Sequence, residues 1–428
     1  MSKQRAPDHV STRIDEKLAL LSRETSKPYI FRVHSQLRKE NENAYEPKVV
    51  AIGPYHHGKD NLGEMEKHKL RCLHLLLERT EESSVDRYVM AMRDLEESAR
   101  KCYAETIRLN KDDFVEMMIL DGCFIIELFR QFYFRDLRER NPDDHILQLG
   151  QIRFAIRSDL MLFENQLPFF ILVRLFNMTK VLSPQDDIIN LALKFLGHIM
   201  PTPKVLNRIS VDNVNHLLGL LHKSWCSSFA AMVSHSNVVN QENKLEFIKS
   251  TTELLEAGIK FKPYESTSLL DIKFKNGVME IPSFMVGDST EIAFRNLIAY
   301  EQYLDKSYPR YVTDYMIFMD HLINSAKDVE KLRQYGIINN WLGDDEAIST
   351  MLNKLGNNVV LGSEFTYREV FKNVNKHCRQ RQNIWMANLR RNYFNSPWAI
   401  ISFFAALALL LLTLAQTIFT ILSFFKQK

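Results

Sequence analysis

Cysteine is scarce in this sequence, and no two cysteines form a Cys-x-x-Cys pair. The chain has 428 residues and five cysteines, which are far apart. This spacing argues against a disulfide framework and against a zinc knuckle. Such usage is typical of a reducing compartment, where each cysteine acts as a small buried apolar side chain. The five are Cys72, Cys102, Cys123, Cys226 and Cys378.

A large excess of one charge is missing, and so are the common catalytic motifs. The formal net charge is +3, whereas nucleic-acid binding usually needs a concentrated basic face, so we expect no nucleic-acid partner. We find no glycine-rich phosphate loop, no G-x-S-x-G elbow and no kinase signature set. The sequence therefore predicts no enzyme and no cofactor or metal site. Its hydrophobic content of 46% is ordinary for a globular protein with a large core.

One segment lacks charge altogether. Asn392–Phe425 contains no Asp, Glu, Lys or Arg, and a helix needs only about 20 apolar residues to cross a bilayer. We therefore predict a transmembrane helix over 397–425, with a lipid bilayer as its partner. The alternative is a buried helix of a soluble protein, which would need protein around its whole length.

Charges beside this segment predict its orientation. More cations precede it than follow it, since only Lys426 and Lys428 come after, and the positive-inside rule then places the large domain in the cytosol. Residues 1–26 lack the apolar run of a signal peptide, so we expect a tail-anchored single-pass protein, for instance of the plasma membrane. Glycosylation of the sequon at Asn177 would indicate the reverse topology. The preceding cations are Lys372, Lys376, Arg379, Arg381, Arg390 and Arg391.

The predicted transmembrane helix carries small and polar residues on one side, within an arc of about 120°. Such a stripe permits close helix approach and interhelical hydrogen bonds. We therefore predict lateral association through it, with a second copy or with another protein. The alternative is that the threonines bond their own i−4 carbonyls and face lipid. The stripe comprises Ser402, Ala405, Ala406, Thr413, Gln416, Thr417 and Thr420.

Hydrophobic periodicity predicts a mainly α fold with one large multi-helix domain over 27–391. Residues 1–26 are read as a polar, partly disordered arm that ends in a short helix. Alternating apolar residues around Asn276-Gly277 predict one small β-hairpin near 268–282, because Asn-Gly favours a type I′ turn. A stretch that begins at Lys111 is apolar on most faces and should form a central helix.

Several helix limits are also predicted. Asp60 or Asn61 is expected to cap a helix that begins at Leu62, and Asp288 with Glu291 resembles a capping box. A helical stretch from Arg157 to Phe176 should be interrupted or kinked at Pro168, which lacks a backbone donor. The last soluble helix is expected over 366–391, running into the span.

Three groups of residues are candidates for chemistry. His56-His57 invites a metal site, but adjacent histidines point apart, so we favour a structural turn. Cys123 follows Asp121-Gly122 as a candidate nucleophile, although burial in an apolar helix would raise its pKa and leave it inert. Glu164-Asn165-Gln166 is polar within an apolar segment, so it either staples two helices or lines a pocket. Arg157 or Arg153 is the expected partner of Glu164.

Several motifs together resemble a plant family named only as domain of unknown function 247. The resemblance covers the chain from about Ile30 to its carboxyl terminus. It implies plant proteins with one carboxyl-terminal span and no established enzymatic activity, some of whose grass members take part in self-incompatibility recognition. The motifs are Ala44–Pro47, Ile52–Gly58, Met65–Lys69, Asp121–Phe124, Asp159–Pro168, Thr252–Leu254, Ala257–Ile259 and Asn392–Trp398.

Within these motifs we expect the polar and turn residues to be structural rather than functional. The preferred function is a membrane-tethered module for protein interaction or recognition, in signalling, defence or self-incompatibility, with an unknown protein partner. The alternative is a membrane-bound enzyme with an unrecognised site built from His56, His57 and Glu164. The expected structural positions are Gly53, Pro54, Tyr55, His56, His57, Asp121, Gly122, Glu164, Asn165, Gln166 and Pro168.

Overall fold

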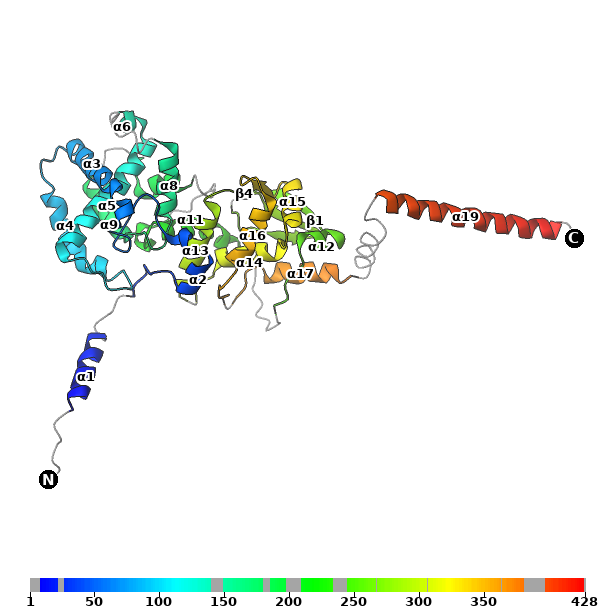
Figure 1. Cartoon of the computed structure of the whole chain (residues 1–428), viewed down its shortest axis with the longest axis horizontal. Helices are drawn as coiled ribbons and strands as arrows, with labels where there is room; N and C mark the ends of the chain where they lie inside the picture. Colours follow the sequence, from blue (N-terminus) through cyan, green and yellow to red (C-terminus); the bar gives the residue numbers. More distant parts are fainter. Residues whose placement is uncertain are drawn as a thin grey trace, which may run out of the picture. The chain divides into compact units, whose positions relative to one another are not determined.

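The computed structural model is mostly helical, with a few short strands (Figure 1). The chain forms two compact units, each assembled from several stretches. The first unit comprises Met1–Ser236, Asp288–Thr313 and Asn357–Gly362, and the second comprises Asn237–Gly287, Asp314–Gly356 and Ser363–Lys428. The single domain over 27–391 stays a prediction. The structure describes residues 8–21, 27–139, 149–179, 185–197, 209–233, 245–266, 268–305, 307–362, 364–380 and 397–426.

The first unit is built from helices and short 3₁₀ turns. Its helices are α1 (His9–Leu21), α2 (Ser35–Glu40), α3 (Glu64–Arg79), α4 (Asp86–Arg100), α5 (Lys111–Tyr133), α6 (Arg135–Glu139), α8 (Gly150–Leu160), α9 (Phe169–Met178), α10 (Ile188–Leu196), α11 (Leu217–Val233) and α13 (Thr290–Tyr303). Its 3₁₀ turns are η1 (Glu42–Tyr45), η2 (Asp60–Leu62) and η3 (Val211–Asn213). Helix α14 (Tyr311–Leu322) begins in this unit and continues in the second.

Helix α5 lies at the centre of the first unit, and α3, α4, α9 and α10 all pack against it. Asn110 caps its start by accepting a hydrogen bond from the backbone N–H of Asp113 at 2.9 Å. Nearly every residue from Phe114 to Arg130 is buried, which is the main source of apolar burial in this unit. The prediction of a central helix from Lys111 is confirmed.

The stretch that was expected to be interrupted or kinked at Pro168 is two helices separated by a loop. Helix α8 ends at Leu160, and α9 begins at Phe169 after Pro168. A proline biases the residue before it away from the helical region, which ends a helix more often than it kinks one. The predicted interruption is therefore confirmed, although it extends over the whole loop 161–168. The loop over 161–168 is buried, and its polar side chains satisfy backbone groups that would otherwise be unpaired.

Two predicted helix caps are wrong. Asp60 and Asn61 belong to η2, and α3 begins at Glu64 with no side-chain hydrogen bond at its N-cap. The N-cap of α13 is Ser289, again without a side-chain bond. The Glu291 side chain instead accepts from Arg295 of the same helix at 2.8 Å and from Asn41 at 3.0 Å, so a tertiary contact with Asn41 takes the place of the cap.

The second unit combines helices with two small sheets. Its helices, besides the end of α14, are α12 (Thr251–Glu256), α15 (Ala326–Gln334), α16 (Asp345–Leu355), α17 (Arg368–Cys378) and α19 (Pro397–Lys426). Its strands are β1 (Lys260–Tyr264), β2 (Lys273–Lys275), β3 (Val278–Pro282), β4 (Phe284–Val286) and β5 (Ile338–Asn340).

The predicted hairpin is confirmed and is part of a larger sheet. Strands β2 and β3 pair antiparallel, with Phe274 opposite Met279. Asn276 and Gly277 link them with positive φ angles of 53° and 76°, as a type I′ turn requires. The sequence did not predict β1, which pairs parallel with β3, or the parallel pair of β4 and β5. These strands are short, so their apolar alternation is weak.

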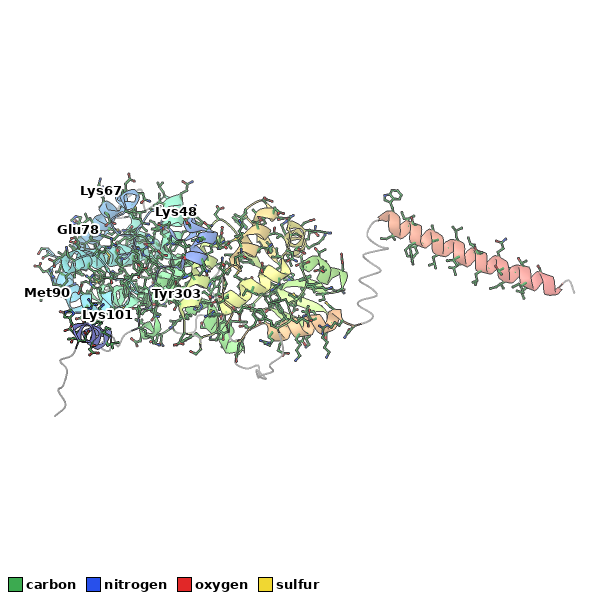
Figure 2. All side chains as sticks on the ribbon, turned by 60° about the horizontal axis from the view of Figure 1, so that its bottom comes forward. Lys48, Lys67, Glu78, Met90, Lys101 and Tyr303 are labelled. Atoms are coloured by element: carbon green, nitrogen blue, oxygen red, sulfur yellow. The ribbon has the colours of Figure 1, made fainter. Side chains whose placement is uncertain are left out.

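Helix α19 is long and apolar enough to span a membrane. The stretch Ile400–Ser423 has a mean hydropathy of 2.2, and none of its most apolar window is buried by protein. Figure 2 shows the described side chains of this helix. Helix α17 ends at Cys378 rather than at 391, and residues 381–396 lie outside the described part of the chain. The predicted amino-terminal arm contains α1.

Candidate functional site

The Gly-Pro turn at 53–54 is held by a group of buried polar side chains from the first unit. Gly53 has a φ of +73°, and its backbone N–H donates to the Asp121 carboxylate at 2.8 Å. A Cβ atom at Gly53 would lie closer to the backbone oxygen of Gln166 than the 3.0 Å that real Cβ atoms keep. Only glycine therefore fits this position, for reasons of both backbone angle and space.

The chain just before this turn is anchored by Asp159 at the end of α8. Its carboxylate accepts from the backbone N–H groups of Lys48, Val49 and Val50 at 2.9, 2.7 and 2.9 Å. Asn165 continues the anchoring, because its amide donates to the carbonyl of Val50 and its oxygen accepts from Ile52 N–H. These side chains form the hydrogen bonds with the backbone of this segment that a neighbouring strand would otherwise provide.

A buried lysine binds the backbone just before the turn. The Lys69 ammonium on α3 donates to the carbonyl of Ala51 at 2.7 Å and lies 2.6 Å from the carboxylates of both Asp121 and Glu66. Burial alone would lower the pKa of Lys69, but these two carboxylates raise it above its ordinary value. The lysine therefore stays charged although its side chain is fully buried.

Glu164 is the charged centre of the group. It accepts from Val33 N–H at 2.7 Å and from the Arg38 guanidinium at 2.6 Å, and Arg32 lies 3.4 Å away. The prediction that Arg157 or Arg153 would pair with Glu164 is wrong. Because Glu164 lies in the loop after α8, its partners come from the amino-terminal segment, and Arg157 donates to the carbonyl of Phe195 instead.

The two histidines of the turn have different environments. His56 is fully buried, lies 3.8 Å from Glu164, and has no hydrogen-bond partner on either ring nitrogen among the described residues. Burial and the nearby Lys59 charge lower the pKa of His56 to about 3, so its ring is neutral. His57 is half-buried. The Tyr55 hydroxyl next to them donates to the carbonyl of Ile30.

The other motif residues also meet backbone or pack closely. The Gln166 amide donates to the carbonyls of Leu160 and Leu162, both at 2.8 Å. A Cβ at Gly122 would collide with the Leu175 side chain, so this glycine permits close packing of α5 on α9. Cys123 is fully buried, and burial raises its pKa to about 12, as expected for an inert thiol.

These contacts serve the backbone rather than a ligand. Glu164, Asp159, Asn165, Gln166 and Asp121 all bind main-chain groups of segments far away in sequence. Glu164 and Asp159 each accept three donors, so most of the roughly four acceptor positions of each carboxylate are already used. These residues were candidates in the sequence because they are polar side chains within apolar segments. The structure joins them into one group, and no contact of His57 with this group is found among the described residues.

A second cluster in the first unit was missed by the sequence analysis. His222 Nε2 on α11 lies 2.7 Å from the Glu301 carboxylate on α13 and 3.5 Å from the Cys226 sulfur. All three side chains are buried. Burial would lower the pKa of His222, but Cys226 and Glu301 raise it to about 10. The spacing His-x-x-x-Cys, which places both ligands on one helix face, was the available signal.

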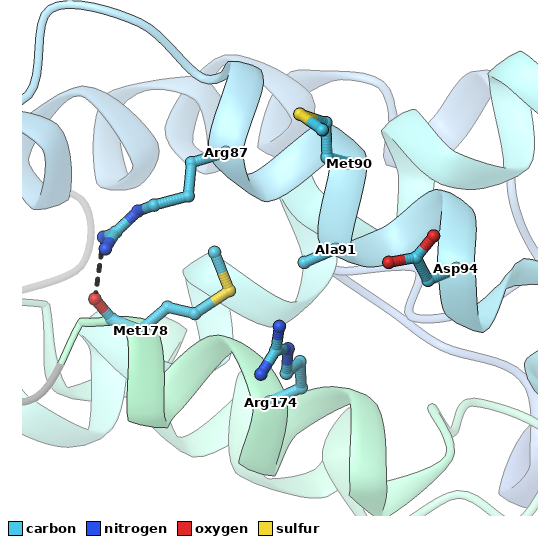
Figure 3. Close-up of a pocket in the computed structure, with 6 residues that line it drawn as sticks. All are labelled: Arg87, Met90, Ala91, Asp94, Arg174 and Met178. Carbon is cyan, nitrogen blue, oxygen red and sulfur yellow. Dashed lines mark hydrogen bonds between the residues drawn. The ribbon is translucent and has the colours of Figure 1, made fainter.

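A groove between α4 and α9 was also missed (Figure 3). It has a volume of about 520 Å³. Met90 at its rim is 69% exposed, and the Arg87 guanidinium donates to the carbonyl of Met178 at 2.8 Å. Arg174 has no ion-pair partner in the described part of the chain. The residues that line the groove are Arg87, Met90, Ala91, Asp94, Arg174 and Met178.

The threonine hydroxyl groups in the polar stripe of α19 are occupied. Thr413 and Thr417 donate to the carbonyls of Leu409 and Thr413 at 2.7 and 2.8 Å, and Thr420 donates to that of Gln416. This is the alternative expected from the sequence. The same hydroxyl oxygens can still accept, so association through Ser402, Ala406, Gln416 and these threonines stays a prediction.

Comparison with known proteins identifies relatives along nearly the whole chain. The UPF0481 protein At3g47200 of Arabidopsis thaliana is 32% identical over 422 residues, which cover 93% of this chain and 87% of the relative. The putative UPF0481 protein At3g02645 of the same plant is 24% identical over 487 residues, which cover 92% and 90%. No solved structure matches. The model of DUF247, described as a plant protein of unknown function, matches residues 30–412, and the chain belongs to this family.

Proposed function

We propose that this protein is a membrane-tethered binding module whose first unit engages another protein on the cytosolic side. The observation that carries the proposal is α19, whose most apolar window has no protein around it. An apolar helix of this length is stable in water only if something covers it, and a bilayer does so along its whole length.

The flanking charges support a cytosolic position for both units. Six cations lie in the twenty residues before Asn392, and two lysines follow the helix. The cysteines Cys72, Cys102, Cys123, Cys226 and Cys378 are all free thiols, as is common in a reducing compartment.

The groove between α4 and α9 is the surface that we assign to the partner. It combines the thioether side chains of Met90 and Met178 with two guanidinium groups and one carboxylate. Glu82 already forms an ion pair with Arg87, so Arg174 is the guanidinium that we assign to the partner. Exposed methionines adapt to varied apolar side chains, and guanidinium groups bind carboxylates through paired hydrogen bonds. The chemistry fits a peptide segment that places an acidic residue beside an apolar one.

Selection of peptides tests this assignment directly. The full chain, held in lipid nanodiscs, would be used to select from a random peptide library. We expect enrichment of Asp or Glu next to Leu, Phe or Met. Arg174→Glu should shift the enriched charge from acidic to basic, and Met90→Glu should reduce enrichment of apolar residues.

Matched controls come from α3, outside the groove. Lys67→Glu reverses an exposed cation, and Leu70→Glu places a charge on an exposed apolar side chain, so both imitate the groove variants (Figure 2 labels Lys67 and Met90). Neither should change the selected peptides. Peptides without a charge preference, or the same peptides with Arg174→Glu, would refute the groove as the binding surface.

Orientation has its own test. Protease added to sealed microsomes that carry the full chain should digest both units, because they face outward as in the cytosol. Protection of the units, or glycosylation of the exposed Asn177, would contradict the proposed side. The alternative of a membrane-bound enzyme stays a prediction. The burial of His56 and the occupied carboxylate of Glu164 give it no specific support.

A further inference from the structure

The cluster of His222, Cys226 and Glu301 has the composition of a metal site. His222 and Cys226 lie four residues apart on α11, so their side chains share one face of the helix. Glu301 reaches the same point from α13. Within the described residues this is the group of His, Cys, Asp or Glu side chains whose ligand atoms converge, all within 4.8 Å of one another.

The distances between these atoms can be compared with those of a bound ion. A tetrahedral zinc ion with ordinary bond lengths places its nitrogen and sulfur ligands about 3.6 Å apart, and its nitrogen and oxygen ligands about 3.4 Å apart. The observed separation of His222 Nε2 and Cys226 Sγ is 3.5 Å, and that of Nε2 and the Glu301 oxygen is 2.7 Å. The first distance already fits. The second requires the oxygen and nitrogen to separate by less than 1 Å, which a side-chain rotation provides.

The Glu301 carboxylate is held in place by groups that would support a metal ligand. Its two oxygens accept from the backbone N–H groups of Val312 and Thr313, at 3.0 and 2.8 Å, at the start of α14. Hydrogen bonds of this kind orient ligating carboxylates and are common around metal ions. The carboxylate can accept these bonds and still offer a lone pair, because each oxygen has two.

The ligand types select among the common metals. Calcium and magnesium prefer sites made only of oxygen. A thiolate together with an imidazole and one carboxylate suits zinc or a similar borderline ion. We propose that His222, Cys226 and Glu301 bind one zinc ion, which leaves a fourth coordination position for water. The bound ion joins α11 to α13 and to the start of α14.

Metal binding displaces the protons that the ligand atoms carry. The ion replaces the proton shared by His222 and Glu301, and the Cys226 thiol gives up its own to become a thiolate. Both protons pass to solvent. The ion thereby compensates the buried negative charges of the thiolate and the carboxylate.

Cobalt substitution provides the test. The full chain in detergent micelles would be stripped with a chelator and titrated with Co²⁺. We expect a sulfur-to-cobalt charge-transfer band and the visible bands of four-coordinate cobalt, which saturate at about one ion per chain and disappear when Zn²⁺ is added. Zn²⁺ should also slow alkylation of Cys226, measured by peptide mass spectrometry.

Variants decide whether these residues form the site. Cys226→Ser, nearly equal in size, should abolish the charge-transfer band, and His222→Gln should weaken binding by about tenfold or more. Cys72→Ser is the matched control, because Cys72 is a buried cysteine on another helix of the same unit. Circular dichroism would verify that each variant is folded. Absence of the band in the wild-type chain, or its persistence in Cys226→Ser, would refute the site.

Discussion

Replacement of Gly53 by alanine tests the idea that the turn is locked by contact with the loop after α8. Gly58 provides a matched control five residues away, because both glycines have nearly equal positive φ angles, 73° and 76°. An added Cβ at Gly58 meets no atom within 4 Å, whereas one at Gly53 meets the backbone oxygen of Gln166. The two variants therefore share the backbone strain and differ only in the collision.

The magnitudes follow from these contacts. Alanine with a left-handed backbone costs about 1–2 kcal/mol, and this is the full effect expected for Gly58→Ala. At Gly53 the Gln166 carbonyl must also move, and it accepts the Tyr103 hydroxyl at 3.0 Å. The Gln166 side chain holds that loop through two further hydrogen bonds. The loop therefore cannot move without losing a hydrogen bond. One lost buried hydrogen bond adds about 1–3 kcal/mol.

Urea unfolding of the full chain in detergent, followed by the fluorescence of Trp225, measures the first unit. Trp225 is buried in this unit. We expect Gly53→Ala to lower the free energy of unfolding by at least twice as much as Gly58→Ala. Equal losses for both variants would show that the collision is relieved at no cost, and that the turn is not locked against the loop.

Three other predictions concern charge and the membrane helix. Burial raises the pKa of Asp159 to about 6, despite the three N–H donors, so the folded chain keeps this proton to a higher pH than the unfolded chain does. Its contribution to stability is therefore present below about pH 4 and lost as the pH rises through about 6. Asp159→Asn should weaken the pH dependence of the urea unfolding midpoint over this range. The same pH dependence in wild type and variant would contradict the assignment. Glu164→Gln should lower the free energy of unfolding by about 2 kcal/mol. The double variant with Arg38→Gln should lower it by less than the sum of the single variants, because in a chain without the Glu164 charge Arg38 has no buried ion-pair partner left to lose. If helix association occurs, Thr413→Leu with Gln416→Leu should weaken it by about 1 kcal/mol in a bilayer energy-transfer assay, and equal association would refute the stripe.

The sequence predicted local structure well where the signal is local. The charge-free segment, the central helix from Lys111 and the Asn276-Gly277 hairpin each depend on residues that are neighbours in the chain. The errors occurred where a tertiary contact replaced a local one. The break near Pro168 extends over a whole loop that buried side chains hold, and Glu291 binds Asn41, far away in sequence, in place of capping its own helix.

The composition of the candidate sites could be predicted only in part, for the same reason. That Glu164 must be paired follows from its polar character within an apolar run, but its partners Val33 and Arg38 are about 130 residues away, and nothing in the chain near Glu164 indicates them.

The same limit explains why the His222 cluster was missed. The spacing of His222 and Cys226 is visible on one helix, yet two ligands do not define a metal site. The third, Glu301, is brought in by the packing of α13 on α11, and its carboxylate is oriented by backbone N–H groups that exist only once α14 has formed. A metal site of this kind depends on the completed fold, and it follows that metal binding at this cluster should report on whether these three helices are correctly packed.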